Sequence, residues 1–152
     1  IFFLFRAEDG IREPLWSRGL GDGDKRQGID SSYMKDGVVW CPTYSLQPEK
    51  GQKLFHTAKY GWLAHYANGL LLVKDFPDIT VAEMPPGQGE AEIYIAPGGV
   101  YIELENHGRY VTLIPGDSTV YHQKWFLLNA GEQDAEGLIR MVNEILRSPS
   151  GF

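Results

Sequence analysis

The sequence predicts a mainly β protein: an antiparallel β-sandwich followed by one C-terminal amphipathic helix. Three observations lead to this prediction. From residue 28 onward, short apolar or alternating segments are separated by closely spaced turn signals, the pattern of a sandwich or barrel. Two of the turns, Asn68-Gly69 and the one around Pro97-Gly98, have hairpin composition. Near the C-terminus, apolar residues recur at helical spacing instead.

The first 27 residues differ from the rest of the chain. They show no sustained helical or strand period, and glycines cluster at Gly19, Gly21 and Gly23. The blocks 6–12 and 17–22 resemble a peptide that arises when sequencing-adapter DNA is translated at the edge of a metagenomic read. We therefore expect residues 1–27 to be a non-native or disordered leader, with a genuine flexible arm as the alternative. The chain as a whole then resembles a fragment, with a partial β-sandwich domain at 28–130 and the helix and tail at 131–152.

Charge and cysteine content exclude some partners. The net charge of −6 opposes attraction to nucleic-acid phosphates or anionic membranes, so neither is an expected partner. The single Cys41 cannot form an intrachain disulfide, and no Cys/His spacing is that of a zinc site. We therefore expect no metal and no cofactor. The apolar run Ile1–Phe5 is too short to span a bilayer, and oligomeric state stays open.

The first two predicted strands differ in strength. Val38–Cys41 is an apolar run that ends at Pro42, as a strand would. Lys53–Lys59 is a weaker candidate.

The strongest local signal is a hairpin. Gly61–Ala67 and Leu70–Asp75 flank Asn68-Gly69, whose residues favour the two positive φ angles of a type I′ turn.

A second hairpin pairs Ala91–Ile95 with Val100–Glu105 across a turn rich in proline and glycine at 96–99. Its alternation places Ile93, Ile102 and Leu104 on the face toward the core. The opposite face receives Glu92, Tyr94, Tyr101, Glu103 and Glu105.

The last elements follow two more turns. Tyr110–Ile114 is predicted as a short strand, and Thr119–Leu128 as a long one. Because the long strand mixes apolar and polar residues on both faces, we expect it to be covered on both sides. Asp134–Arg147 has the spacing of an amphipathic helix, which Pro149 stops.

The second hairpin also predicts an acidic and aromatic surface. If its turn is centred on Pro97-Gly98, Tyr94 lies opposite Tyr101 and Glu92 lies opposite Glu103. Directly opposed like charges in a sheet are unfavourable, so something must offset them. The candidates are a bound cation, a shared proton, or a basic neighbour such as Lys74, Lys124 or Arg109.

Glutamates beside tyrosines are typical of a sugar site, where rings cover the apolar face of the sugar and carboxylates bind hydroxyls. The alternative is a solvated outer face with ion pairs. Other candidates, each with a structural alternative, are His65 and His122 as general acids and Trp62, Tyr66 and Trp125 as stacking platforms.

Other chemistry has no support in the sequence. His56 and His107 lie in weak or turn segments and give no usable signal. No nucleophile elbow, phosphate loop or metal-ligand cluster is present, which argues against hydrolase, nucleotide-binding and metalloenzyme interpretations.

Three blocks carry a family resemblance: 61–64 through 72–76, then 92–94 with 101–105, then 113–117 leading to Trp125. Over roughly 38–128 they resemble the C-terminal half of the bacterial galactose mutarotase-like domains catalogued as domain of unknown function 4380. The resemblance implies a partial β-supersandwich with a sugar-binding concave sheet. It also implies a bacterial protein, whose location stays open, the periplasm and the exterior included.

In mutarotases, a late-strand glutamate acts as base on the anomeric hydroxyl while a histidine protonates the ring oxygen. By position, Glu103 or Glu105 matches that glutamate, and the histidine is expected from an earlier strand, in a part of the fold that this chain lacks. The expected function is carbohydrate binding with mutarotation or epimerisation. The alternative is a non-catalytic β-sandwich module of a larger protein. The candidate catalytic residues are Glu103, Glu105 and His122, and the candidate sugar-binding residues are Glu92, Tyr94, Tyr101, Trp62, Lys74 and Trp125.

Overall fold

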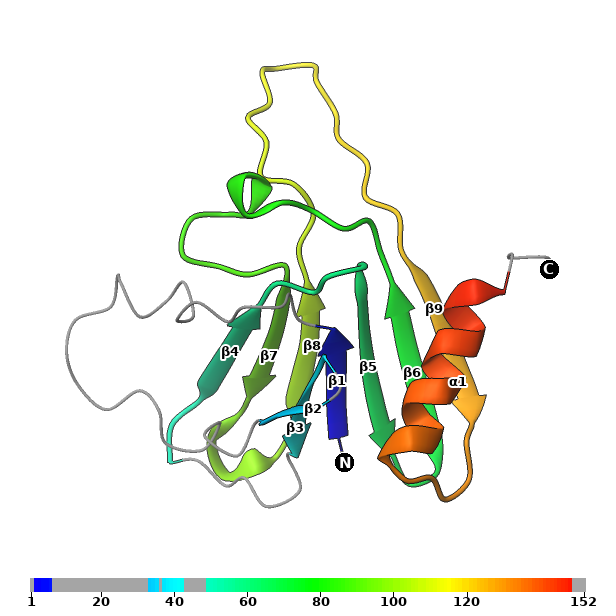
Figure 1. Ribbon diagram of the computed structural model, residues 1–152. Helices are drawn as coiled ribbons and strands as arrows, with labels where there is room; N and C mark the ends of the chain where they lie inside the picture. Colours follow the sequence, from blue (N-terminus) through cyan, green and yellow to red (C-terminus); the bar gives the residue numbers. More distant parts are fainter. Residues whose placement is uncertain (1, 7–32, 36, 43–48, 149–152) are drawn as a thin grey trace.

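The computed structural model describes residues 2–6, 33–35, 37–42 and 49–148, and within them the protein is mainly β (Figure 1). The elements are β1 (Phe2–Arg6), β2 (Tyr33–Lys35), β3 (Val38–Pro42), β4 (Gln52–His56), β5 (Trp62–Ala67), β6 (Leu70–Asp75), the 3₁₀ turn η2 (Val81–Glu83), β7 (Ala91–Ile95), the 3₁₀ turn η3 (Pro97–Gly99), β8 (Ile102–Asn106), β9 (Lys124–Asn129) and the helix α1 (Ala135–Arg147). The described strands form a larger sheet in the order β2-β3-β1-β5-β6-β9 and a smaller one in the order β4-β7-β8. All their pairings are antiparallel.

The two sheets share a buried core. Apolar residues on one face of the larger sheet pack against those on one face of the smaller sheet, which removes both from water. The larger sheet contributes residues such as Cys41 and Leu63, and the smaller contributes residues such as Leu54 and Ile93. Ile102 and Leu104 of β8 pack against this core, as the alternation predicts.

The helix α1 covers the other face of the larger sheet (Figure 1). Leu138 and Val142 of α1 lie in a second buried cluster with Trp62 of β5 and Leu71 of β6. The predicted helix is confirmed: Asp134 caps its start and accepts a 2.8 Å hydrogen bond from the Gly137 amide. Among the described residues, no helix has the length and apolarity needed to cross a membrane.

The β5–β6 hairpin matches its prediction. Ala67 pairs with Leu70, and the two residues between them have the positive φ angles that the turn requires, 52° at Asn68 and 76° at Gly69.

The β7–β8 hairpin is present, but its predicted register is wrong by two residues. Ile95 pairs with Ile102 and the Ala96 amide donates to the Tyr101 carbonyl at 3.0 Å, so the turn centres on Gly98-Gly99. Both glycines have positive φ, 67° and 66°, and this places the reversal one residue later than Pro97-Gly98. A shift of two keeps the paired side chains on their predicted faces. Val100, which the alternation places toward the core, instead lies in the turn and is 78% exposed. The pairs become Glu92 with Glu105 and Tyr94 with Glu103.

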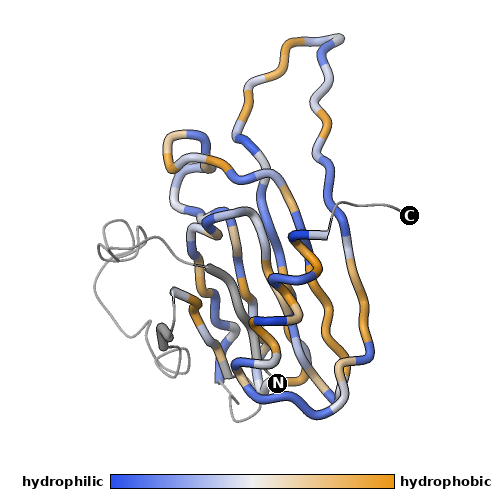
Figure 2. Tube along the Cα trace, turned by 45° about the vertical axis from the view of Figure 1, so that its right-hand side comes forward, coloured by the Kyte–Doolittle hydropathy of each residue, from blue (hydrophilic) through white to orange (hydrophobic). Residues whose placement is uncertain are grey.

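The segment between β8 and β9 also differs from its prediction. Residues 107–123 are all described and contain no strand, so Tyr110–Ile114 is not one. They form a long excursion beyond the ends of the sheets (Figure 1), with hydrophobic segments on both of its arms (Figure 2). The predicted strand at 119–128 is shorter, starting at Lys124.

The expected cover on both sides of this last strand is absent. Phe126 packs against the helix-side core, but Trp125 and Leu127 on the other face are 64% and 69% exposed. The reason is that the smaller sheet reaches only as far as β6, where Lys74 contacts Leu104.

Part of the expected leader belongs to the fold. Phe2–Arg6 forms β1, which pairs with β3 and β5 within the larger sheet. The run Phe2–Phe5 is uniformly apolar and contains three phenylalanines, a residue type that favours strands. The blocks 6–12 and 17–22 lie, apart from Arg6, outside the described residues.

Candidate functional site

The outer face of the smaller sheet carries the predicted acidic and aromatic residues. Register aligns Lys53, Tyr94 and Glu103 in one cross-strand row. Phe55, Glu92 and Glu105 form the neighbouring row. We call this surface the carboxylate face; it comprises Lys53, Phe55, Glu92, Tyr94, Glu103 and Glu105, with Tyr101 and His107 at the two ends of β8.

Lys53 offsets the opposed glutamates. Glu92 is only 2% exposed, and its Oε1 accepts a hydrogen bond from the Lys53 ammonium. That bond raises the pKa of Lys53 above its usual value, against a smaller opposing effect of desolvation. The ammonium also lies 5.8 Å from the centroid of Tyr94 and 5.9 Å from that of Phe55.

Two of the three basic neighbours expected for this role, Arg109 and Lys74, have other contacts. Arg109 pairs with Glu83, with Nε 3.1 Å from Oε1. Lys74 donates to the Leu104 carbonyl. The compensating charge therefore comes from β4, the strand with the weaker sequence signal.

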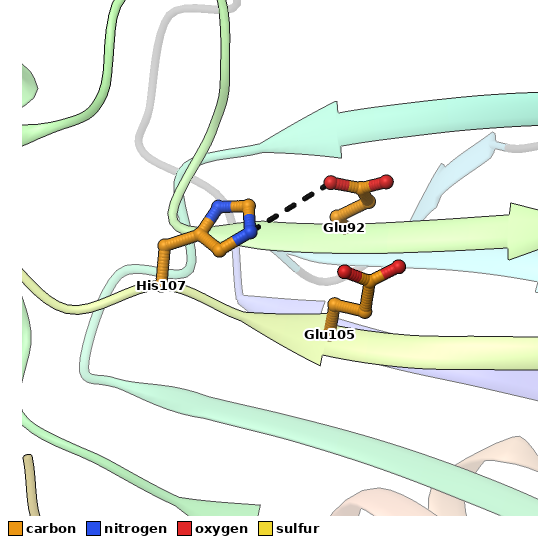
Figure 3. A group of neighbouring side chains, drawn as sticks. All are labelled: Glu92, Glu105 and His107. Atoms are coloured by element: carbon orange, nitrogen blue, oxygen red, sulfur yellow. Dashed lines mark ion pairs between the residues drawn. The ribbon is translucent and has the colours of Figure 1, made fainter.

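His107 joins the carboxylate face although its own segment gave no signal. Its Nδ1 lies 2.8 Å from the Gly89 carbonyl oxygen, and its Nε2 lies 3.7 Å from Oε2 of Glu92. Figure 3 shows its imidazole beside Glu92 and Glu105 at one end of β7 and β8. One ligand atom from each of the three residues lies within 4.8 Å of the others.

A sequence signal for His107 does exist. The alternation Glu103, Glu105, His107 continues the strand period for one more step. The His107 amide donates to the Glu90 carbonyl at 2.7 Å, so the β7–β8 pairing extends past Asn106. The turn composition at 106–108 hid this extension.

Glu90 fixes the backbone behind this end of the hairpin. Its carboxylate is fully buried and accepts 2.9 Å hydrogen bonds from the amides of Ala58 and Ile79. Burial is the main cause that raises the pKa of Glu90 to about 7. Its side chain thus joins two loops, while its carbonyl positions His107.

The tyrosines form the aromatic part of the face. The rings of Tyr94 and Tyr101 lie 6.0 Å apart with an interplanar angle of 54°. Tyr94 is half-buried, and Tyr101 is 52% exposed. A side chain at position 51 would overlap the Tyr94 ring, so Gly51 makes room for it.

Lys74 and Trp125 lie on the larger sheet, on the face toward the smaller one. Lys74 is 7% exposed, and its ammonium donates to the Leu104 carbonyl at 2.7 Å. The ammonium also lies 4.8 Å from the centroid of the exposed Trp125 ring. Burial lowers the pKa of Lys74, while Glu105 acts in the opposite direction. Both residues therefore belong to the larger sheet and not to the carboxylate face, although the charge of Lys74 interacts with that of Glu105.

Two predicted site residues are elsewhere. Trp62 is 4% exposed in the core beneath α1, so it is not a stacking platform; the apolar surroundings of β5 explain its burial. His122 is exposed in the 107–123 excursion and belongs to no strand. Glu92, Tyr94, Tyr101, Glu103 and Glu105 do share one surface.

The fold and this surface define a class: a mainly β protein with two antiparallel sheets, one C-terminal helix and a carboxylate and histidine cluster on the smaller sheet. Residues 22–128 match the family described as Domain of unknown function (DUF4380), and the chain belongs to that family. The match begins within the stretch that we assigned to a leader. No curated protein and no solved structure matches the chain.

Proposed function

We propose that the carboxylate face binds a carbohydrate, and that Glu105 and His107 interconvert its anomers by general acid–base catalysis. The observation that carries this proposal is the placement of a half-buried glutamate and a half-buried histidine side by side, on a face that also has two tyrosines. A glutamate base and a histidine acid are the two residue types that the resemblance to galactose mutarotases implies, although the resemblance expects the histidine from an earlier strand, whereas His107 follows β8. Under this proposal the domain is a sandwich of the galactose mutarotase-like type.

Each residue of the proposed site has a separate task. Tyr94 and Tyr101 cover the apolar face of the sugar ring, and Glu103 accepts hydrogen bonds from its hydroxyls. Glu92 pairs with Lys53 and so contributes to the charge balance of the sheet. Glu105 and His107 are left to act on the anomeric centre.

The proposed reaction is a pair of proton transfers. Glu105 takes the proton of the anomeric hydroxyl, and protonated His107 gives the proton on Nε2 to the ring oxygen. The bond between the anomeric carbon and the ring oxygen breaks, which leaves an open-chain aldehyde. After rotation about the adjacent carbon–carbon bond, the same transfers in reverse close the other anomer. Nδ1 keeps its hydrogen bond to Gly89 throughout.

The test is the rate of anomer exchange in freshly dissolved α-D-galactose and α-D-glucose, followed by polarimetry above the spontaneous rate. Glu105→Gln keeps the shape of the side chain but removes the base, and it should lower the catalysed rate by about 10²- to 10⁴-fold. His107→Asn should cause a similar loss. Glu136→Gln, an exposed glutamate on α1, is the matched control and should leave the rate unchanged.

Two results decide between catalysis and binding alone. If the wild-type chain gives only the spontaneous rate and binds no sugar in calorimetry, the proposal is wrong. Sugar binding without catalysed exchange would instead support the second candidate, a non-catalytic carbohydrate-binding module. One observation favours that candidate: Lys53 already offsets Glu92, so the face needs no catalytic role to be stable.

A further inference from the structure

We infer that Glu92, Glu105 and His107 form a binding site for a divalent transition-metal cation, for which Zn²⁺ is the probe. This inference goes beyond the proposed function and does not depend on sugar binding. It also differs from the expectation of no metal, which was based on the absence of a zinc-like spacing of cysteines and histidines in the sequence. Two carboxylates and one imidazole are a ligand set that zinc accepts, with a fourth position left for water.

The histidine makes this more than a group of acids. Nδ1 of His107 lies 2.8 Å from the Gly89 carbonyl oxygen, which can only accept a hydrogen bond. Nδ1 therefore carries a hydrogen, and in the neutral ring Nε2 presents its lone pair toward the two glutamates. A backbone carbonyl on the far ring nitrogen is the usual outer partner of a metal-bound histidine.

The atoms around this point are acceptors. Nε2 of neutral His107, Oε2 of Glu92 and a carboxylate oxygen of Glu105 converge on one region (Figure 3). The 3.7 Å between Nε2 and Oε2 is longer than a hydrogen bond. A cation between them satisfies all three lone pairs, whereas one proton on Nε2 can satisfy at most part of them.

The spacing suits a small cation after slight closure. Oxygen and nitrogen ligands of tetrahedral zinc lie roughly 3.4 Å apart, given bond lengths of about 2.0 to 2.2 Å. The three ligand atoms are within 4.8 Å of one another, and one pair is at 3.7 Å. Side-chain rotations of Glu105 and His107, both half-buried, can supply the difference.

The charges nearby permit the cation and limit its affinity. Lys53 holds Oε1 of Glu92 but leaves Oε2 toward His107. The Lys53 side chain is 50% exposed, so it can move away when a cation arrives. Lys74 donates to the Leu104 carbonyl of β8, and its positive charge also interacts with Glu105. Glu103, one step along β8, adds negative charge at the exposed side.

The imidazole also selects the metal. Hard cations such as Ca²⁺ and Mg²⁺ prefer oxygen ligands alone, so they should bind much more weakly than Zn²⁺. A bound cation and a proton compete for the same lone pair of Nε2. Under the proposed function, Zn²⁺ should therefore inhibit anomer exchange.

The experiment is a calorimetric titration of the metal-free full chain with Zn²⁺ in the absence of sugar. We expect one equivalent to bind. Glu105→Gln and His107→Ala should weaken binding by more than about 100-fold, beyond the 10- to 100-fold typical of an outer partner. The matched controls are Glu103→Gln, on the same strand and face, and the exposed His122→Ala. Glu103→Gln removes a nearby charge but no ligand and should weaken binding several-fold at most, and His122→Ala should bind as the wild type does.

Two further measurements keep the result clear. Lys53→Met removes the cation that competes for Glu92 and should raise the zinc affinity several-fold. In the wild-type chain, Co²⁺ should shift or broaden the NMR signals of His107 and leave those of His122 unchanged, which requires no variant to fold. No saturable binding, equal losses in Glu105→Gln and Glu103→Gln, or unaffected His107 signals would overturn the inference. Because no sugar is present, this outcome is independent of that of the proposed reaction.

Discussion

The buried carboxylate of Glu90 connects two segments that are separate in the sequence. It accepts from the amides of Ala58 and Ile79, which precede β5 and η2, and neither amide has another partner within hydrogen-bond distance in the described contacts. Glu90→Gln keeps one acceptor and turns an NH₂ group toward the other amide. We expect it to lower the free energy of unfolding by about 1 to 3 kcal/mol, the usual cost of an unsatisfied buried group.

Urea denaturation of this variant gives the measurement. The exposed Glu132→Gln is its control and should stay within about 0.5 kcal/mol of the wild type. A Glu90 variant that is as stable as the wild type would show that the two amides find water instead.

His56 gives a pH-dependent prediction. Burial lowers the pKa of His56 from 6.5 to about 4. Between these values the unfolded chain binds more protons than the folded one, so stability is full above pH 6.5 and falls as the pH decreases toward 4. The expected loss is roughly 3 kcal/mol, given about 1.4 kcal/mol per pKa unit.

The contribution of His56 is measured as a difference between two proteins, so that the contributions of all other titrating groups cancel. Unfolding free energies of the wild type and His56→Gln are compared from pH 7 to pH 4 in small steps. As the pH falls, the unfolding free energy of the wild type should decrease relative to that of His56→Gln. A constant gap would show that His56 is protonated as easily in the folded chain as in the unfolded one.

For single residues, the sequence predicts which face of a strand a side chain occupies. It does not predict which residue distant in the sequence that side chain contacts. Alternation places Glu92 and Glu105 together correctly, because strand parity is a local property. Lys53 lies 39 positions from Glu92, and its role depends on the pairing of β4 with β7. No local pattern contains that pairing, which explains why other basic residues were considered.

Among the elements, the helix α1 is the one whose boundary is most clearly set by chemistry. Asp134 accepts from the Gly137 amide at 2.8 Å and satisfies one of the free amides of the first turn. Asp134→Ala should lower the free energy of unfolding by about 1 kcal/mol. Asp134→Ser should lower it much less, because serine can also cap the helix.

Thermal unfolding followed by circular dichroism checks this prediction. Because α1 covers Trp62 and Leu71, the loss should appear in the single transition of the whole domain rather than in local fraying. An alanine variant that unfolds at the wild-type temperature would show that packing alone fixes the start of α1.

Hairpins show how far element-level prediction reaches. The Asn68-Gly69 turn sets its register uniquely, because two residues with positive φ fit one turn type. The longer turn before β8 holds three candidate residues, Pro97, Gly98 and Gly99, and small differences in backbone conformation decide where it reverses. The composition therefore predicts the hairpin and its faces, and leaves the pairing uncertain by two residues.

In the whole molecule, the two layers differ in width. The larger sheet extends past the smaller one, which leaves Trp125 and Leu127 of the edge strand β9 exposed. Exposed apolar edge strands promote association between chains. Leu127→Lys should therefore reduce self-association and change the unfolding free energy by less than about 0.5 kcal/mol.

Light scattering over a range of concentrations measures the association. The contrasting variant is Leu71→Lys, on the neighbouring strand: Leu71 is 0% exposed, and a charge there should unfold the domain. If Leu127→Lys were as damaging as Leu71→Lys, the outer part of β9 would have to be covered in solution.

The sequence does not predict how the two layers are arranged. A mainly β architecture with a terminal helix follows from periodicity alone. The position of β1 between β3 and β5 does not, because Phe2–Arg6 is separated from both by long stretches of chain. Likewise, the exposure of β9 depends on the number of strands in the opposite layer, and no property of residues 124–129 encodes it.

The buried ammonium of Lys74 has a mechanical consequence. It crosses from one layer to the main-chain oxygen of Leu104, the residue between Glu103 and Glu105. If the layers slid past each other, the ammonium of Lys74 would lose its acceptor while still surrounded by apolar atoms. The free-energy cost of such an unpaired buried charge is large. The strand that bears Glu105 is thus tied to the wider layer by a charged hydrogen bond as well as by the apolar core that the two layers share.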